Sequence, residues 1–291
     1  MKYAAILVAC LLGLAHAQEK PPEDKPAEGE QPPAEGAPAE GEEEEPASKA
    51  PPPPPTDPKK LLGDLTLANA AKDTTGIDIA VKDALAWSKG AKDPELIEPM
   101  AIELATAIKH SKGNWGTLTA IVEALGELRS KEGMKTLKKL AFKKEAKDES
   151  EEKLQAAAIV AFSKYADPKE IEPFGEMGQS KSVIIAKAAY QAFASYEPAK
   201  GKVRRQCAEI LMKRLDAEYP SSAGGQGGGG GTSKEKQERW ADVSPAIVTS
   251  MKALCREATI NDIDNWREWW KENKKNPRAN AWKDEDEKES S

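Results

Sequence analysis

An internal repeat of a helical pattern is the feature of this sequence that most constrains its fold. Each copy places six small or apolar residues at offsets of 0, 3, 4, 7, 8 and 11, which trace one face of an α-helix. The first four copies are separated by 40, 37 and 31 residues, enough for two helices and two short turns. The sequence therefore predicts a series of helix pairs. The copies begin at Ile77, Thr117, Leu154, Ile185 and Ile247.

The other helix of each pair has a recurring start. Asp-Pro-Glu-Leu-Ile-Glu-Pro begins at Asp93, and the similar Asp-Pro-Lys-Glu-Ile-Glu-Pro begins 74 residues later at Asp167. Ser130 stands halfway between them in register, and Asp57 precedes a further proline. An Asp followed by Pro is a helix N-cap with proline at the first helical position. We expect the second proline of each heptapeptide to bend the first turns of its helix.

These motifs resemble the HEAT-repeat family, whose repeats pair a proline-bent first helix with a second helix ending in Ala-Leu-Gly-x-Leu, found here at residues 124–128. The resemblance covers residues 58–260. The Asp and Val-Arg that such repeats often place near the start of the second helix are absent. The resemblance implies an all-α fold, a right-handed α-solenoid of about five helix pairs. It also implies, by fold-level analogy, a protein-interaction scaffold.

Composition agrees with a helical fold and argues against most enzyme classes. Aromatic residues make up only 5% of the chain, and Ala, Leu, Glu and Lys dominate, which argues against an all-β fold. The two histidines are His16 and His110, and His16 lies in a segment that we expect to be cleaved off. Histidine-based metal sites are therefore not expected. No nucleophile elbow, P-loop or zinc-ligand spacing occurs, so we predict no enzyme and no cofactor.

The N-terminus has the pattern of an export signal. Residues 1–17 combine Lys2, an apolar run and Ala-His-Ala, which predicts a signal peptide cut before Gln18. A lipobox-like sequence ends at Cys10, but only nine residues precede it, too few for the usual signal regions. We therefore predict a soluble exported protein of the periplasm or extracellular space. No later segment has the eighteen or so consecutive apolar residues of a membrane span.

Three segments are predicted to be disordered. Residues 18–57 form an acidic, Pro-rich tether; residues 18–60 hold 13 of the 21 prolines and 12 acidic against 5 basic residues. Removing that stretch and Lys2 leaves 37 acidic and 37 basic residues, so a nucleic-acid surface is not indicated. Residues 224–232 form a Gly-rich insertion inside the repeats, and residues 283–291 form an acidic tail.

Residues 261–282 are predicted to form a Trp-rich C-terminal capping helix. Trp266, Trp269 and Trp270 lie at i, i+3 and i+4, so they share one face of a helix that we expect Asn265 to N-cap. The three indoles can cover the apolar end of the last repeat. Alternatively, they form an exposed aromatic platform for sugar rings or a Pro-rich peptide. The solvent exposure of the indoles distinguishes the two.

Cys207 and Cys255 are the two cysteines outside the signal segment, and they are candidates for a disulfide in an oxidising compartment. If the later helix starts at Pro245, with Ser244 as its N-cap, the two cysteines stand at about the same height in an antiparallel pair. Two buried free thiols are the alternative. A lysine cluster is interpreted as a solvated helix face rather than an anion-binding strip; it comprises Lys135, Lys138, Lys139, Lys143, Lys144 and Lys147.

These observations lead to two functional hypotheses. The first is a non-catalytic scaffold that binds a protein partner on the solenoid surface. The second is a module that binds carbohydrate or another cell-envelope polymer through exposed tryptophans. The sequence identifies neither the partner nor the oligomeric state.

Overall fold

The computed structural model describes residues 57–90, 92–144, 146–220, 234–276 and 280–283. These residues form eleven α-helices and three short 3₁₀ helices and contain no β-strand. All described residues belong to one compact unit within Pro53–Ser291. The predicted signal peptide, the tether up to residue 56, the Gly-rich insertion and the tail beyond residue 283 lie outside the described residues.

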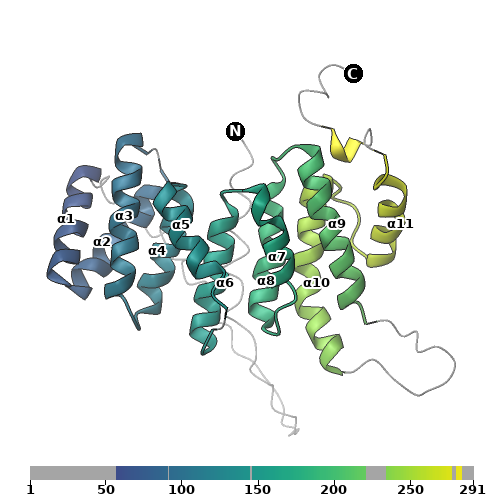
Figure 1. Cartoon of the computed structure of the whole chain (residues 1–291), viewed down its shortest axis with the longest axis horizontal. Helices are drawn as coiled ribbons and strands as arrows, with labels where there is room; N and C mark the ends of the chain where they lie inside the picture. The colour runs from purple at the N-terminus through teal and green to yellow at the C-terminus, as the bar shows by residue number, and fades with distance from the viewer. Residues whose placement is uncertain (1–56, 91, 145, 221–233, 277–279, 284–291) are drawn as a thin grey trace, which may run out of the picture. The chain divides into compact units, whose positions relative to one another are not determined.

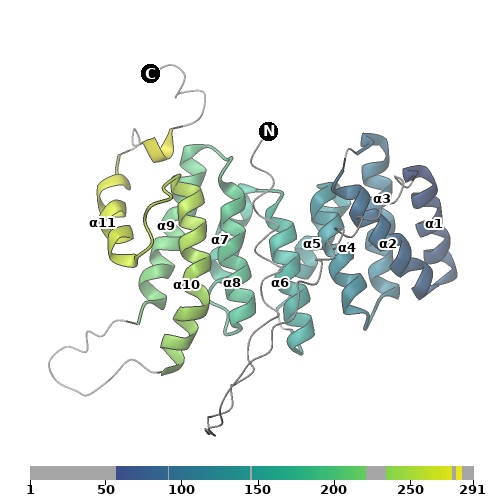
Figure 2. The same cartoon turned by 180° about the vertical axis from the view of Figure 1, so that it is seen from behind.

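The helices follow one another in chain order from α1 to α10 (Figures 1 and 2). The odd-numbered helices are α1 (Pro58–Ala71), α3 (Pro94–His110), α5 (Lys131–Ala141), α7 (Ile171–Met177) and α9 (Gly201–Glu218). The even-numbered helices are α2 (Thr74–Ser88), α4 (Trp115–Leu128), α6 (Glu149–Ser163), α8 (Val183–Ala192) and α10 (Lys234–Cys255). The chain then continues into α11 (Ile263–Asn273), and the 3₁₀ helices are η1 (Pro168–Glu170), η2 (Phe193–Tyr196) and η3 (Asn280–Trp282).

The packing has a regular order. Each odd-numbered helix from α1 to α9 packs against the even-numbered helix that follows it. Each even-numbered helix from α2 to α8 also packs against the next even-numbered helix, and α1 packs on α3, α3 on α5 and α7 on α9. At the C-terminal end, α11 contacts α9, while η3 contacts both α9 and α10. The described residues are thus an all-α unit in which helices close in sequence bury one another.

The predicted starts of the odd-numbered helices are confirmed. The side chains of Asp57 and Asp93 accept the backbone N–H two residues later at 3.0 Å, and Ser130 accepts that of Gly133 at 2.8 Å. Asp167 caps η1 in the same way, at 3.0 Å. These bonds satisfy amides that the helix itself cannot. In the second heptapeptide the helix begins as η1 before α7, whereas in the first, Pro99 lies within a continuous α3.

The repeated apolar face forms the core of the unit. In the copy that begins at Ile185, all six positions are buried, and in the copy at Ile247 the first five are. The last position of that fifth copy, Ala258, is exposed beyond the end of α10. Each fully buried large apolar side chain, such as Phe193 or Ile247, stabilises the fold by about 1.5–3 kcal/mol.

Gly126, in the Ala-Leu-Gly-x-Leu segment, allows α4 and α6 to approach closely. A Cβ at this position would lie 2.9 Å from the Cβ of Ala161, closer than real side chains pack. Glycine is therefore required here because the two helices are in close contact, and not because the backbone has an unusual φ angle. The same position in the next copy is Ser163, whose Oγ lies 2.8 Å from Ser195 Oγ.

Two predicted helix starts near the C-terminus are wrong. The helix α11 begins at Ile263, and its N-cap is Asp262, whose carboxylate accepts the N–H of Asn265 at 2.8 Å. The side-chain amide of Asn265 also donates to Asp262, so Asn265 lies inside the helix and supports its cap. The helix α10 does not begin at Pro245 but contains it. The turns of α10 that precede Pro245 are stabilised by packing, because Trp240 lies edge-on against Tyr219 with ring centroids 5.3 Å apart.

Candidate binding face on the even-numbered helices

A groove of about 440 Å³ lies across α2, α4 and α6. Its lining combines apolar and small side chains with one carboxylate and one lysine at its margins. Trp115, at the start of α4, is 37% exposed, which makes it one of the few large apolar side chains of the described residues that reach solvent. The groove is lined by Leu85, Trp115, Gly116, Thr119, Ala120, Glu123, Ser150, Lys153 and Leu154.

Local structure holds Trp115 at the edge of this groove. Asn114 caps α4 by accepting the N–H of Thr117 at 3.3 Å, which places Trp115 in the first turn and outside the buried face. The hydroxyl of Thr117 donates to Asp78 of α2, and Lys82 lies 2.7 Å from the same carboxylate. These two donors hold the pKa of Asp78 below its usual value. The start of α4 is therefore fastened to α2 beside the groove.

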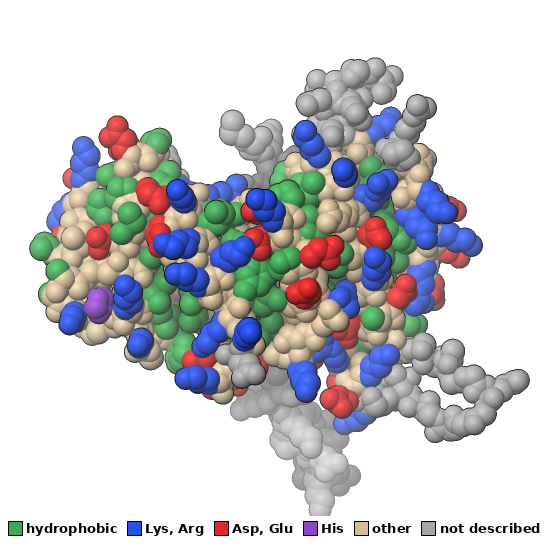
Figure 3. All heavy atoms as spheres, viewed as in Figure 1, with side chains coloured by type: hydrophobic (Ala, Val, Ile, Leu, Met, Phe, Trp, Pro, Cys, Tyr) green, Lys and Arg blue, Asp and Glu red, His purple; other side chains and the backbone are tan. Residues whose placement is uncertain are grey.

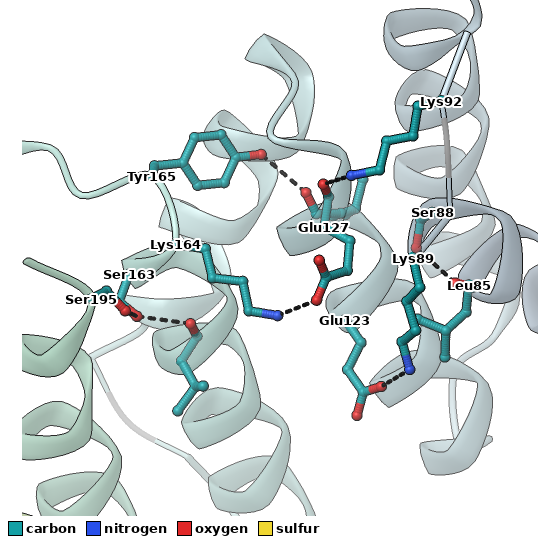
Figure 4. A network of polar contacts seen from close by, with 12 residues as sticks. Leu85, Ser88, Lys89, Lys92, Glu123, Glu127, Ser163, Lys164, Tyr165 and Ser195 are labelled. Carbon is teal, nitrogen blue, oxygen red and sulfur yellow. Dashed lines mark hydrogen bonds and ion pairs between the residues drawn. The ribbon is translucent and has the colours of Figure 1, made fainter. Parts of the chain in front are cut away.

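The C-terminal ends of the same three helices form a second feature, which we call the cationic rim. It consists of Lys89, Arg129 and Lys164, the residues that cap the C-termini of α2, α4 and α6, together with Lys92. Figure 4 shows the contacts that link these ends. Lys164 Nζ lies 2.6 Å from Glu127 Oε1, and Lys89 Nζ lies 3.9 Å from Glu123 Oε2.

Lys92 enters the rim from the segment before α3. Its ammonium group donates to the backbone carbonyl of Glu127 (Figure 4). Burial lowers the pKa of Lys92; Glu127 opposes this effect, while Arg129 and Lys164 add to it by repulsion. Lys92, Arg129, Lys164 and the Glu127 carboxylate therefore lie close enough to influence one another.

The rim was not predicted, although the sequence carries a signal for part of it. Lys89 and Arg129 each stand twelve residues after the first position of their copies of the repeat, at Ile77 and Thr117. A repeated cation directly after a repeated apolar face could have been noticed. Lys164 lacks that spacing, because it stands only ten residues after Leu154. Its convergence with the others depends on tertiary packing.

The structure gathers the three predicted tryptophans with a fourth, Trp282. Trp266 is 0% exposed, and Trp269 and Trp270 are half-buried. Ring centroids are 5.6 Å apart for Trp266 and Trp269, 5.9 Å for Trp269 and Trp282, and 6.2 Å for Trp270 and Trp282, all edge-on. Trp282 Nε1 donates to the carbonyl of Asn273 at 3.2 Å. The indoles thus pack against one another at the C-terminal end of the helices.

The two cysteines are free thiols in the structure, and both are buried. Cys207 lies in α9 and Cys255 is the last residue of α10. Burial raises the pKa of both thiols well above the usual range, so neither is poised to react as a thiolate.

Three members of the predicted lysine cluster pair with carboxylates. Lys135 and Lys143 pair with Glu132 and Glu151, at 3.3 and 2.7 Å. Lys138 pairs with Glu170. Figure 3 shows basic and acidic side chains interspersed over one face of the molecule.

The described residues also bear on metal and membrane binding. They contain no group of three or more His, Cys, Asp or Glu side chains arranged to hold a metal ion. His110 is the final residue of α3, near carbonyls that favour a cation. None of the helices in the described ranges combines the length and apolar character needed to cross a membrane.

Comparison with known proteins assigns no family. No protein-family description, no curated protein and no solved structure matches this chain. The likeness to HEAT repeats therefore remains a resemblance in sequence motifs.

Proposed function

We propose that this protein is an exported, non-catalytic scaffold that binds a protein partner on the even-numbered helices. In this proposal the helices form a right-handed, HEAT-like α-solenoid of about five pairs. The contacts between successive even-numbered helices support that arrangement, because they create one surface that several repeats share. The predicted signal peptide supports a location in the periplasm or outside the cell.

The half-exposed indole of Trp115 beside an apolar groove is the observation that carries the proposal. Tryptophan is enriched among the residues that dominate binding energy at protein interfaces. An apolar hollow next to it offers a place for a side chain of the partner. The neighbouring small residues Gly116 and Ala120 leave the backbone of α4 accessible.

The alternative, a sugar-binding platform built from Trp266, Trp269 and Trp270, receives less support. A platform needs flat indole faces open to solvent, whereas Trp266 is buried and the other two present their rings to the edges of neighbouring indoles. This arrangement favours a cap over the last helices.

The proposal is tested by capturing proteins from the native extracytoplasmic fraction with the full chain and with two variants. Trp115→Ser changes the groove, and Leu67→Ser is a matched control because Leu67 is an exposed apolar residue of α1 outside the groove. Removing an interface tryptophan costs at least about 2 kcal/mol, so enrichment of a genuine partner should fall about thirtyfold with Trp115→Ser and stay unchanged with Leu67→Ser. Equal enrichment by all three proteins would refute binding at this groove.

A further inference from the structure

Three successive even-numbered helices end at a cation. Lys89, Arg129 and Lys164 cap α2, α4 and α6, and these helices pack side by side. Arg129 is exposed, and its guanidinium has no carboxylate partner among the described residues. The next repeat does not continue this series of capping cations. Its second helix is followed by η2, whose C-cap is Glu197, and Arg256 Nε lies 3.4 Å from Glu197 Oε1.

The charges of the rim do not balance. Lys89, Lys92, Arg129 and Lys164 face the carboxylates of Glu123 and Glu127, which leaves two positive charges in excess. The excess falls to one if Glu98 is counted. Glu98 is held at the start of α5, where each of its carboxylate oxygens accepts a backbone N–H at 3.0 Å, and it keeps its negative charge there.

The helix macrodipole explains only part of this charge. A cation at a helix C-terminus is stabilised by the unpaired carbonyl groups there, which accounts for the three capping residues. Lys92 instead precedes the N-cap of α3, where the macrodipole disfavours a cation. It is nevertheless partly buried against Glu127 and lies within reach of repulsion from Arg129 and Lys164. The macrodipole therefore does not account for the position of Lys92 in the rim.

The spacing expected for the ends of three packed helices matches that of an extended polypeptide. Packed helices lie about 8–10 Å apart. A polyproline II segment advances about 9 Å per three-residue turn, so every third side chain points the same way at the same interval. We infer that the cationic rim binds an extended acidic segment of the partner, with a carboxylate at about every third residue. This inference rests on the proposed scaffold function and specifies the chemistry of the partner.

The groove and the rim are continuous, which favours a peptide over an anionic polysaccharide. Glu123 lines the groove and also pairs with Lys89 of the rim. A bound peptide can therefore place carboxylates on the rim and an apolar side chain at the end of the groove that Glu123 shares with Leu85 and Ala120. A polyuronate could satisfy the cations but has no apolar side chain for the groove.

The test measures binding of fluorescent peptides to the full chain by anisotropy. One peptide has about six Glu-Pro-Pro triplets, and the other has the same composition with its glutamates in adjacent pairs. The triplet peptide should bind more tightly, by about fivefold, and raising the salt concentration should weaken it. Arg129→Gln and Lys164→Gln should each weaken it about two- to fivefold, whereas Lys213→Gln, on the exposed part of α9, should have no effect.

Two outcomes would overturn the inference. If the two peptides bind with equal affinity, and Arg129→Gln does not change that affinity, the rim does not recognise carboxylates at every third residue. Tighter binding of polyglucuronate than of either peptide would make it a polysaccharide site. The scaffold proposal can be tested separately by the capture experiment. If Trp115→Ser no longer captures the partner but Arg129→Gln still does, the partner binds at the groove and the proposed acidic segment is rejected. Circular dichroism checks that each variant is folded.

Discussion

Gly201, the first residue of α9, lies directly against the backbone carbonyl of Trp282. A Cβ on Gly201 would overlap that carbonyl oxygen, so only glycine permits the contact. One turn later, the buried Arg204 extends the same junction: its Nη2 donates to the carbonyl of Lys283 at 2.9 Å, and its Nη1 lies 3.4 Å from the carbonyl of Leu254. The end of the described chain is therefore fastened to α9 and α10.

Gly201→Ala should displace η3 from α9. Because the clash is with backbone, relief requires the segment at Trp282 to move, and we expect a loss of about 1–3 kcal/mol in the free energy of unfolding. Urea denaturation followed by tryptophan fluorescence measures it. Gly63→Ala is the control, since a Cβ there meets nothing within 4 Å and alanine favours the helix by up to about 1 kcal/mol. Equal effects of the two substitutions would contradict the proposed clash.

Arg239→Gln should loosen the first turns of α10. Arg239 binds Glu218 of α9 through two bonds, Nε to Oε2 at 2.8 Å and Nη2 to Oε1 at 2.9 Å, and this pair is mostly buried. Losing a charged partner there should cost about 2 kcal/mol and speed hydrogen exchange in residues 234–243. Lys234→Gln is the matched control, because its pair with Glu238 is exposed, and it should change stability by less than about 0.5 kcal/mol. If hydrogen exchange in residues 234–243 is unchanged in Arg239→Gln, the pair with Glu218 does not hold the first turns of α10 in place.

The two thiols should be unreactive until the protein unfolds. Burial raises the pKa of both Cys207 and Cys255, so the attacking thiolate is scarce in the native state. A chain made without residues 1–17, and therefore without Cys10, should react with a thiol reagent only after denaturation. After denaturation, and without added reductant, two thiols per chain should react. A lower count in the denatured, unreduced protein would reveal a disulfide between them.

Stability should fall at alkaline pH. Burial raises the pKa of the Tyr165, Tyr190 and Tyr196 hydroxyls and of both thiols above their unfolded values of about 10 and 8.5. The unfolded chain therefore loses protons first, and the stabilisation that these groups give is complete below the unfolded pKa and declines above it. Urea midpoints should drop steadily from pH 8 to about pH 11.

Tyr196→Phe provides the check on that pH dependence. It removes one titrating hydroxyl and its 2.8 Å hydrogen bond to the carbonyl of Asp167. The variant should be less stable than the parent at neutral pH, by about 1 kcal/mol, but should lose less further stability as the pH rises. An identical decline in both proteins would assign the alkaline effect to other groups.

The sequence by itself determined where most helices start and which faces they bury. Capping by Asp93 or Ser130 involves atoms two or three residues apart, and the apolar face of one helix repeats within eleven residues, so both are local. The misplaced starts, at Asn265 and Pro245, are also instructive. In the first a neighbouring carboxylate competed locally, and in the second a contact between Trp240 and Tyr219 extended a helix past its proline.

Only the tertiary structure decided the rest. The hydrogen bond from Lys92 to the carbonyl of Glu127 and the packing of Trp282 against Trp269 join residues that are distant in sequence. The exposure of Trp115 likewise depends on which helices pack beside it. A helical pattern states which side chains turn inward, but not which neighbouring helix receives them or how far the helices are shifted along their axes. Those shifts depend on contacts such as Gly126 against Ala161, and they set how the C-terminal ends of α4 and α6, capped by Arg129 and Lys164, lie relative to each other.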